Sequence, residues 1–296
     1  MTKPSLLLSV SSRCTGRGLC SACQARSWVR CSAERLLGVP GAEPVTRALL
    51  VAVAELHMEA AWAGFDAWHY DRAMHHFMIA LELATAAGDT YLQAEALAQA
   101  GLAIMAFGHP NDGLKMLQLG LVKAWDISRD EQRAVVVGST GKAAVEACVR
   151  ADSATALADL GELDAAEREQ AKARELWSPT RADRFGDLDR PAALLALRRG
   201  RLDVAEQFAA ASVRRWEGVD RIGHAASRVV LATVHIRAGE PSGLRLAHGA
   251  ITAVTKISSV RARRRLEPLV AALEAWPGRD GQDLARMARQ VTSATA

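Results

Sequence analysis

Aromatic residues are scarce in this 296-residue chain, and long apolar runs are missing from it. Phe, Trp and Tyr make up only 5% of the residues, so side chains that favour β-strands are sparse and a sheet protein is not expected. Gly, Arg, Asp or Glu interrupts every apolar run before it reaches the ~20 residues of a membrane-spanning helix. Alanine, the strongest helix former, is abundant instead. The composition therefore predicts an all-α chain that does not span a membrane.

Cysteine is rare outside the N-terminal segment. Four of the five cysteines lie within the first 31 residues, and one lies in the remainder of the chain: Cys14, Cys20, Cys23 and Cys31, then Cys148. Disulfides are therefore not expected to hold the main part of the chain together, which indicates a cytoplasmic location. The apolar stretch 6–10 is shorter than the core of a signal peptide, so secretion is not predicted.

The main part of the chain carries no excess charge. The formal net charge is +4, and residues 1–43, with six basic and two acidic residues, account for all of it. Residues 44–296 hold 31 basic and 31 acidic residues. Such a balance produces no long-range field that would steer the protein onto nucleic acid or an anionic membrane.

An internal repeat with a period near 40 residues organises the sequence. Five times, an apolar-periodic segment ends at a short break and a second Ala-rich segment follows, with breaks that begin at Trp68, Gly108, Gly161, Gly200 and Gly239. Glycine at a break can end the first helix in a left-handed conformation. Asp or Ser shortly after the break is expected to cap the second helix. Repeats of this length predict a solenoid of helical hairpins.

Small residues recur at fixed distances from the breaks. Seven positions before them lie Ala61, Gly101, Ala154, Ala193 and Ala232, and twelve positions after them lie Ala80, Gly120, Ala173, Ser212 and Ile251. The fifth repeat needs a slip of one residue, which brings Gly243, Ala247 and Ala250 into register. Small residues at these positions allow two helices to approach closely, and Phe77 in the first repeat is a candidate packing residue between them.

These offsets resemble the tetratricopeptide repeat, a helix-turn-helix unit, and residues 68–83 (WHYDRAMHHFMIALEL) are most similar to it. The period of 39 to 40 residues and the missing large aromatic residue in repeats three to five depart from that family. The resemblance implies an all-α α-solenoid of about five tetratricopeptide-like hairpins over residues 44–296, after an irregular or disordered Cys-containing leader at 1–43.

Two regions depart from the regular spacing. The second and third breaks lie 53 residues apart, which predicts a long first helix within residues 130–160. At the C-terminal end, residues 260–275 and 283–291 are expected to form two helices that cap the solenoid, as repeat proteins require. The arginines at 261 and 263–265 are expected on the exposed side of the first of these helices.

The main part of the chain also resembles a family of actinobacterial transcriptional regulators. In that family a helix-turn-helix of the xenobiotic-response-element type precedes tetratricopeptide-like repeats. The resemblance extends over VAVAELHMEAAWAGFDA, GHPNDGLKMLQLG, RAVVVGSTGKAAVEA, DLDRPAALLAL, AAASVRRWEG and SSVRARRRLEPL. It does not include residues 1–43, which are too few for a DNA-binding head. The sequence is therefore expected to be a member without that head, from a truncated regulator or a misassigned start.

Catalytic motifs are missing from the sequence, and no cofactor is predicted. The spacing of the four N-terminal cysteines matches no common zinc motif, although Cys20 and Cys23 form one Cys-x-x-Cys pair, and a zinc-binding protein stays an alternative. A complete DNA-binding regulator is the other alternative. The leading hypothesis is a non-enzymatic module that binds a protein, a peptide or a small effector, with a homodimer left open.

The repeat register also predicts where a ligand would bind. Positions thirteen, ten, six, three and two before each break are expected to face the concave side of the solenoid. This face would carry acidic and aromatic residues in the first two repeats and basic residues in the last two. The candidate binding residues are Glu55, Trp62, Asp66 and Glu95 at one end, and Asp187, Arg190, Arg198 and Arg237 at the other. An extended peptide could place its positive end at the first group and its carboxylate at the second.

Overall fold

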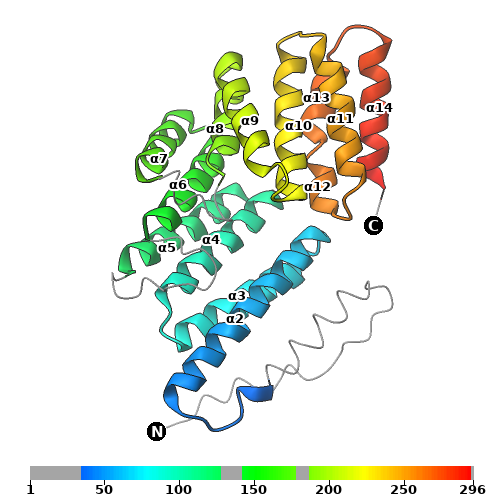
Figure 1. The fold of residues 1–296 in the computed structure, drawn as a ribbon. Helices are drawn as coiled ribbons and strands as arrows, with labels where there is room; N and C mark the ends of the chain where they lie inside the picture. Colours follow the sequence, from blue (N-terminus) through cyan, green and yellow to red (C-terminus); the bar gives the residue numbers. More distant parts are fainter. Residues whose placement is uncertain (1–34, 128–141, 178–186, 295–296) are drawn as a thin grey trace.

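The structure, a computed structural model, describes residues 35–127, 142–177 and 187–294, and its regular elements within these ranges are helices (Figure 1). They are α2 (Glu43–Asp66), α3 (Tyr70–Ala86), α4 (Thr90–Ala106), α5 (Pro110–Asp126), α6 (Lys142–Asp159), α7 (Leu163–Leu176), α8 (Asp189–Arg198), α9 (Leu202–Trp216), α10 (Arg221–Arg237), α11 (Ser242–Thr255), α12 (Val260–Arg264), α13 (Glu267–Glu274) and α14 (Arg279–Ser293). The predicted all-α class is confirmed.

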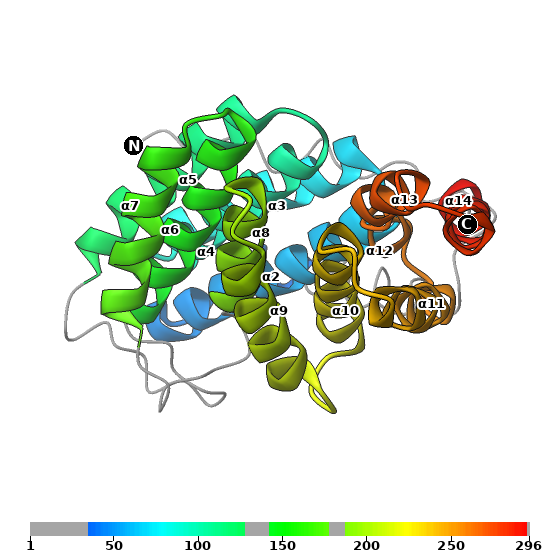
Figure 2. The same ribbon diagram turned by 90° about the horizontal axis from the view of Figure 1, so that it is seen from above.

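Helices that follow one another pack as hairpins, and the hairpins stack in chain order. The pairs are α2 with α3, α4 with α5, α6 with α7, α8 with α9, and α10 with α11, followed by the capping pair α13 and α14. The stack curves so far that α12, near the C-terminus, contacts α2 (Figure 2). The predicted solenoid of five hairpins with C-terminal capping helices is therefore confirmed, and its two ends meet.

The sequence breaks coincide with the turns inside the hairpins. Gly108, Gly161, Gly200 and Gly239 all have positive φ, between 73° and 93°. Trp68 occupies the same position in the first hairpin with a φ of 62°, a conformation that costs a non-glycine residue energy. Its ring lies 4.4 Å from that of Phe107 and 6.2 Å from that of Phe65, and these contacts offset the strain.

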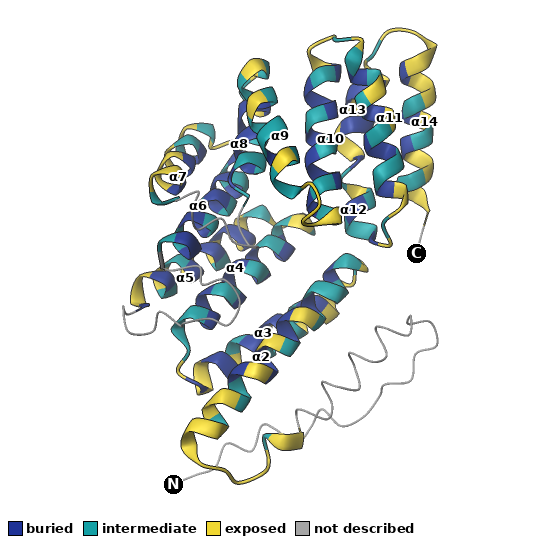
Figure 3. Ribbon diagram, viewed as in Figure 1, coloured by how far each residue is buried: buried dark blue, intermediate teal, exposed yellow. Residues whose placement is uncertain are grey.

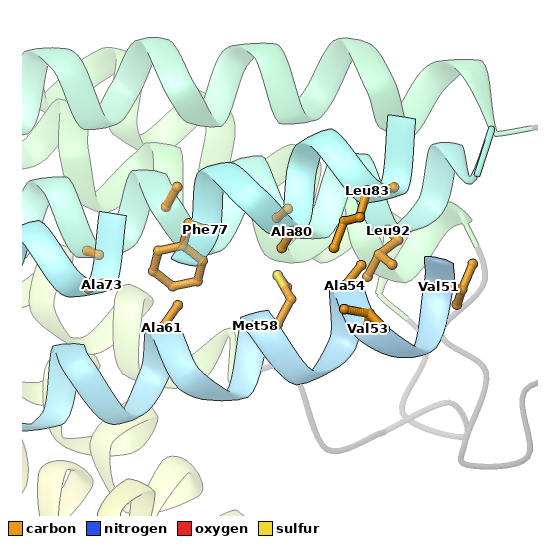
Figure 4. Close-up of a cluster of buried hydrophobic side chains, with 14 of the residues drawn as sticks. Val51, Val53, Ala54, Met58, Ala61, Ala73, Phe77, Ala80, Leu83 and Leu92 are labelled. Atoms are coloured by element: carbon orange, nitrogen blue, oxygen red, sulfur yellow. The ribbon is translucent and has the colours of Figure 1, made fainter. Parts of the chain in front are cut away.

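Small side chains lie where the helices of a hairpin approach most closely. Ala61, Ala73 and Ala80 are fully buried between α2 and α3, where Phe77 fills the space beside Ala61 (Figure 4). The corresponding residues of the other hairpins are buried as well, namely Ala154, Ala166, Ala173, Ala193, Ala205, Ala232, Ala247 and Ala250. The one-residue slip predicted for the fifth repeat is confirmed, because Gly243, Ala247 and Ala250 lie in the interface of α10 and α11.

Side chains cap different helices from those expected. The second helices α3, α5, α7, α9 and α11 have no side-chain hydrogen bond at their N-cap residues. Each begins too soon after its break for the Asp to precede it, so Asp71, Asp112, Asp164 and Asp203 lie inside the first turn. There their negative charges interact favourably with the positive end of the helix dipole, but they do not cap the helix. Asp89, Asp220 and Ser259 instead cap α4, α10 and α12.

The single helix predicted over residues 260–275 was wrong, because the chain forms α12 and α13 with a turn at residues 265–266. Pro268 explains the division. It has no backbone N–H to donate to the carbonyl of Arg264, and its ring would clash with that carbonyl in a continuous helix. The following segment forms α14, which is longer at both ends than the predicted 283–291.

Several expectations fall partly or wholly outside the described residues. They include the leader with its four cysteines up to residue 34, and the part of the predicted long helix before Lys142. Helix α6 itself has 18 residues, close to the 17 of α4. Helix α2 begins at Glu43, one residue before the predicted start of the repeat region.

In the part of the chain that the structure describes, α2 is the one helix long and apolar enough to cross a bilayer by length and composition. Its apolar residues form part of the protein core, because Val53, Ala54, Met58 and Phe65 are buried in the hydrophobic cluster between α2 and α3. Buried residues likewise lie where neighbouring helices face one another throughout the stack, while the outward sides are exposed (Figure 3). The packing accounts for the apolar character of α2.

Candidate functional site

The concave side of the stack contains a cavity of about 830 Å³ that is partly open to solvent. Its wall is formed chiefly by the first helices of the five hairpins, α2, α4, α6, α8 and α10, and α12 and α13 close it on the remaining side. The closure exists because the curvature of the stack brings the first hairpin against the C-terminal cap. A cavity of this size lies within the range of small-molecule sites, which is ~300–1,000 Å³.

The structure brings five of the eight predicted binding residues onto one cavity wall: Trp62, Glu95, Asp187, Arg190 and Arg198. The other three lie elsewhere. Asp66, at the end of α2, forms an ion pair with Arg261 of α12. Glu55 and Arg237 are exposed on α2 and at the end of α10, away from the cavity lining. Binding by the five residues remains a prediction.

The predicted register holds best in the middle of the solenoid. In the second repeat all five positions line the cavity, as Glu95, Ala98, Leu102, Met105 and Ala106. In the fourth they also do, as Asp187, Arg190, Leu194, Leu197 and Arg198. In the first and last repeats some positions turn away, because each hairpin is rotated relative to its neighbour and the same offset points in a new direction at the ends.

The charges are less separated than the expected acidic and basic ends. Asp159 of α6 forms an ion pair with Arg198, so one predicted basic residue is neutralised inside the chain. The carboxylate oxygens of Asp187 are already used by hydrogen bonds within the protein. They accept from the backbone N–H groups of Asp189 and Arg190 at 3.1 Å, from Ser212 Oγ at 2.6 Å and from Trp216 Nε1 at 2.9 Å. Asp187 therefore organises the start of α8.

An indole, an amide and a carboxyl group form a chain across α2 and α4. Trp62 Nε1 donates to Gln99 Oε1 at 2.5 Å, and Gln99 Nε2 donates to Glu95 Oε1 at 2.8 Å. Burial, and to a smaller extent the carboxylate of Glu55, raise the pKa of Glu95 to about 7 against the opposing effect of the hydrogen bond from Gln99. Glu95 is therefore poised to gain or lose a proton near neutral pH.

Two further titratable groups on α6 face the same space. Burial raises the pKa of Asp152 to about 7, with Arg190 opposing the shift. Burial and the nearby Asp152 raise the pKa of the Cys148 thiol to about 12, so this thiol is protonated at neutral pH and is a poor nucleophile. The repeat register did not identify Asp152, because the offset of this residue from the break is outside the predicted set.

The arginines of the C-terminal cap were expected on the exposed side of its first helix. Arg264 is exposed as expected, and the expectation was wrong for Arg261 and Arg265. Arg261 Nη2 lies 2.7 Å from Asp66 Oδ1, and its guanidinium lies 5.1 Å from the ring of Trp62 and 4.9 Å from that of Phe65. Arg265 lines the cavity. Their contacts depend on the meeting of the two ends, which no local pattern in residues 260–275 reveals.

The contact between the ends is a polar clasp, which we define as Asp66 with Ser259, Arg261 and Arg264. Ser259 Oγ donates to Asp66 Oδ1 at 3.2 Å and accepts from the backbone of Ala262 at 3.1 Å. The guanidinium of Arg264 lies 4.5 Å from the ring of Trp68. The clasp therefore joins the first hairpin to the cap and completes the cavity wall.

The raised pKa of Glu95 predicts a pH-dependent stability that Glu95→Gln removes. Because the folded-state pKa of about 7 exceeds the ordinary 4.5, the folded protein holds the extra proton between these values and loses stability as pH rises through that window. Glutamine keeps the bond with Gln99 and carries no charge beside Glu55, Glu59 and Asp89. We expect the variant to match the wild type at pH 4.5 and to exceed it by ~2 kcal/mol at pH 8.

Urea unfolding at a series of pH values measures this difference. A free-energy difference between Glu95→Gln and wild type that stays constant from pH 5 to pH 8 would contradict the raised pKa.

The comparisons with known proteins place the chain in a fold class. No protein-family model and no curated protein match it. Among solved structures it is similar to BtubC (BKLC) from P. vanneervenii, with 14% sequence identity and a TM-score of 0.52 over 87% of this chain and 92% of that one. At such identity the likeness shows the fold alone. The chain is a helical-repeat protein, and the similarity supports the arrangement over most of its length.

Proposed function

We propose that the chain is a non-catalytic helical-repeat module that binds a short peptide or a small effector in its central cavity. The observation that carries the proposal is the cavity itself, onto which five hairpins and the cap converge. Its wall combines apolar and aromatic surface, including Trp62, Phe65 and Trp68, with many charged groups of both signs, so it offers a ligand apolar and ionic contacts together. A folded protein partner is too large for about 830 Å³, so the ligand is small or inserts only a segment.

Within this proposal, the module is the sensing part of a bacterial cytoplasmic transcriptional regulator, as the resemblance of its sequence to such proteins suggests. Direct reading of DNA by this chain is less well supported. Arg261 and Arg265, which belong to its most basic run, face the clasp and the cavity. The protonated thiol of Cys148 argues against nucleophilic catalysis by this residue.

A cavity-filling variant tests the proposal. Leu102 lines the cavity on α4, and Leu102→Trp would add a bulky ring to that space. Leu119→Trp is the matched control, because Leu119 lies on α5 with 53% of its surface exposed and outside the cavity lining. Both variants and the wild type are assayed for thermal stabilisation by a panel of dipeptides to tetrapeptides, carboxylic acids, nucleotides and aromatic metabolites.

We expect at least one compound to raise the Tm of the wild type and of Leu119→Trp by several degrees, and to lose this effect in Leu102→Trp. Stabilisation that survives in Leu102→Trp would place binding outside the cavity and contradict the proposal. A panel without any effect on the wild type would contradict it as well.

A further inference from the structure

Two arginines on the cavity wall have no partner in the described part of the chain. The other arginines of the lining are paired: Arg198 with Asp159, Arg261 with Asp66, and Arg264 with Glu267 at 3.7 Å. Arg190 on α8 and Arg265 in the turn between α12 and α13 make no side-chain hydrogen bond or ion pair with described residues. Both residues are partly buried, and burial together with the charge of Arg190 lowers the pKa of Arg265.

The carboxylates near this pair are already occupied. Asp187 is attracted to Arg190, which lowers the pKa of its carboxyl group, but its oxygens already accept the four hydrogen bonds described above. Asp66 is held by the clasp, and Asp220 accepts from the backbone N–H groups of Ile222 and Gly223 at 3.0 and 2.7 Å, as the N-cap of α10. Asp152 is attracted to Arg190 without an ion pair, and its raised pKa makes it only partly charged at neutral pH.

Partial burial of a guanidinium that forms no ion pair is unfavourable, and arginine cannot lower this cost by losing its charge as a carboxylic acid can. Glu95 and Asp152 become neutral by taking up a proton near pH 7. Arginine stays protonated in proteins, so Arg190 and Arg265 both stay charged and continue to repel one another. An oxyanion between them would receive charge-assisted hydrogen bonds from two planar donors, which is the arrangement that arginine forms best.

We propose that Arg190 and Arg265 together bind an oxyanionic group, a carboxylate or a phosphate, of the ligand that occupies the cavity. This site deepens the proposed function and rests on it. It differs from the arginine set expected from the repeat register, because Arg198 is used by Asp159, Arg237 is exposed outside the cavity lining, and Arg265 comes from the cap. Binding at this site would join the fourth hairpin to the cap, so the ligand would stabilise the closed form of the solenoid.

Simple anions test the site without knowledge of the natural ligand. The wild type, Arg190→Gln and Arg265→Gln are melted in about 50 mM phosphate, sulfate or acetate and in chloride of matched ionic strength. Arg201→Gln is the control, because Arg201 is paired with Glu167 outside the cavity lining and has 51% of its side chain exposed. We expect an oxyanion to raise the Tm of the wild type and the control by roughly 5 °C over chloride. Both cavity variants should lose this increase.

The variants also separate a binding role from a structural one. In chloride, Arg265→Gln should melt at or above the wild-type temperature, because removal of its guanidinium relieves the repulsion by Arg190. Arg190→Gln also loses the attraction to Asp152 and Asp187, so it should melt at or slightly below the wild-type temperature. An effect of acetate alone assigns the site to a carboxylate, and an effect of phosphate and sulfate assigns it to a phosphoryl group. The site is overturned if no oxyanion stabilises the wild type, if both variants keep the stabilisation, or if both melt well below the wild type in chloride.

The cavity-filling experiment distinguishes failure of this site from failure of the proposed function. One informative result is a panel compound that stabilises the wild type and both arginine variants equally but has no effect on Leu102→Trp. This result would keep the cavity as the binding site and would contradict the oxyanion assignment.

Discussion

Replacement of Gly113 by Ala is expected to destabilise the protein by ~2–4 kcal/mol, although alanine is the better helix former. Gly113 on α5 faces Gly101 on α4, and a methyl group at Gly113 would lie 2.7 Å from the carbonyl oxygen of Gly101 and 3.0 Å from the backbone nitrogen of Met105. Backbone atoms cannot rotate away as a side chain does. The two helices would have to separate, and the packing of Leu117 beside Gly101 would be lost.

Gly249→Ala on α11 is the matched control for this prediction. A methyl group there would meet only the end of the flexible Arg228 side chain, with Nη2 at 2.5 Å. The same substitution should therefore be neutral or stabilise the protein by up to ~1 kcal/mol through helix propensity. Chemical denaturation measures both variants. Equal effects at the two positions would show that α4 and α5 are not held by the close approach of their backbones.

The repeat breaks show how much of the fold could be predicted from sequence. Gly108, Gly161, Gly200 and Gly239 were identified by their spacing, and each has the positive φ expected at a hairpin turn. This success has a local cause, since a turn depends on the residues inside one hairpin. The lining of the cavity by the first helices could also be predicted, because all hairpins share one register.

Local reasoning failed where the answer depends on several hairpins together. Whether the ends of a solenoid meet depends on the sum of the small rotations between neighbouring hairpins. No local sequence motif predicts this sum. For this reason Arg261 and Arg265 were expected on an exposed face, and they lie instead in the clasp and in the cavity. The division of the capping helix at residues 265–266 had a local signal in Pro268, which the sequence analysis did not use.

The candidate site combines both kinds of information. Trp62, Glu95 and Arg190 were predicted from the register and line the cavity. Asp152 and Arg265 were not, although both line the same cavity and interact electrostatically with Arg190. The charge balance of the site, and thus the kind of ligand it favours, could be read only after the cap was placed against the first hairpin.

The other large effect is expected from Arg261→Ala, which should loosen α2 and α3 although residue 261 is 195 positions away from Asp66. In an open solenoid each hairpin is stabilised only by its neighbours, so a change in the cap would leave the first hairpin unaffected. Here the clasp connects them. Side-chain exposures of 12% for Arg261 and 29% for Asp66 show a largely buried pair, and loss of one partner from such a pair costs ~3 kcal/mol.

Amide hydrogen exchange distinguishes this coupling from a general loss of stability. In Arg261→Ala we expect faster exchange at both ends of the chain, in α2 and α3 as well as α12, with smaller changes in α6 and α7. Arg286→Ala is the control, because Arg286 pairs with Asp283 at 2.9 Å but has 64% of its side chain exposed, and such a pair contributes ~0.5 kcal/mol or less. Exchange in α2 and α3 that matches the wild type while α12 loosens would show that the clasp does not couple the ends.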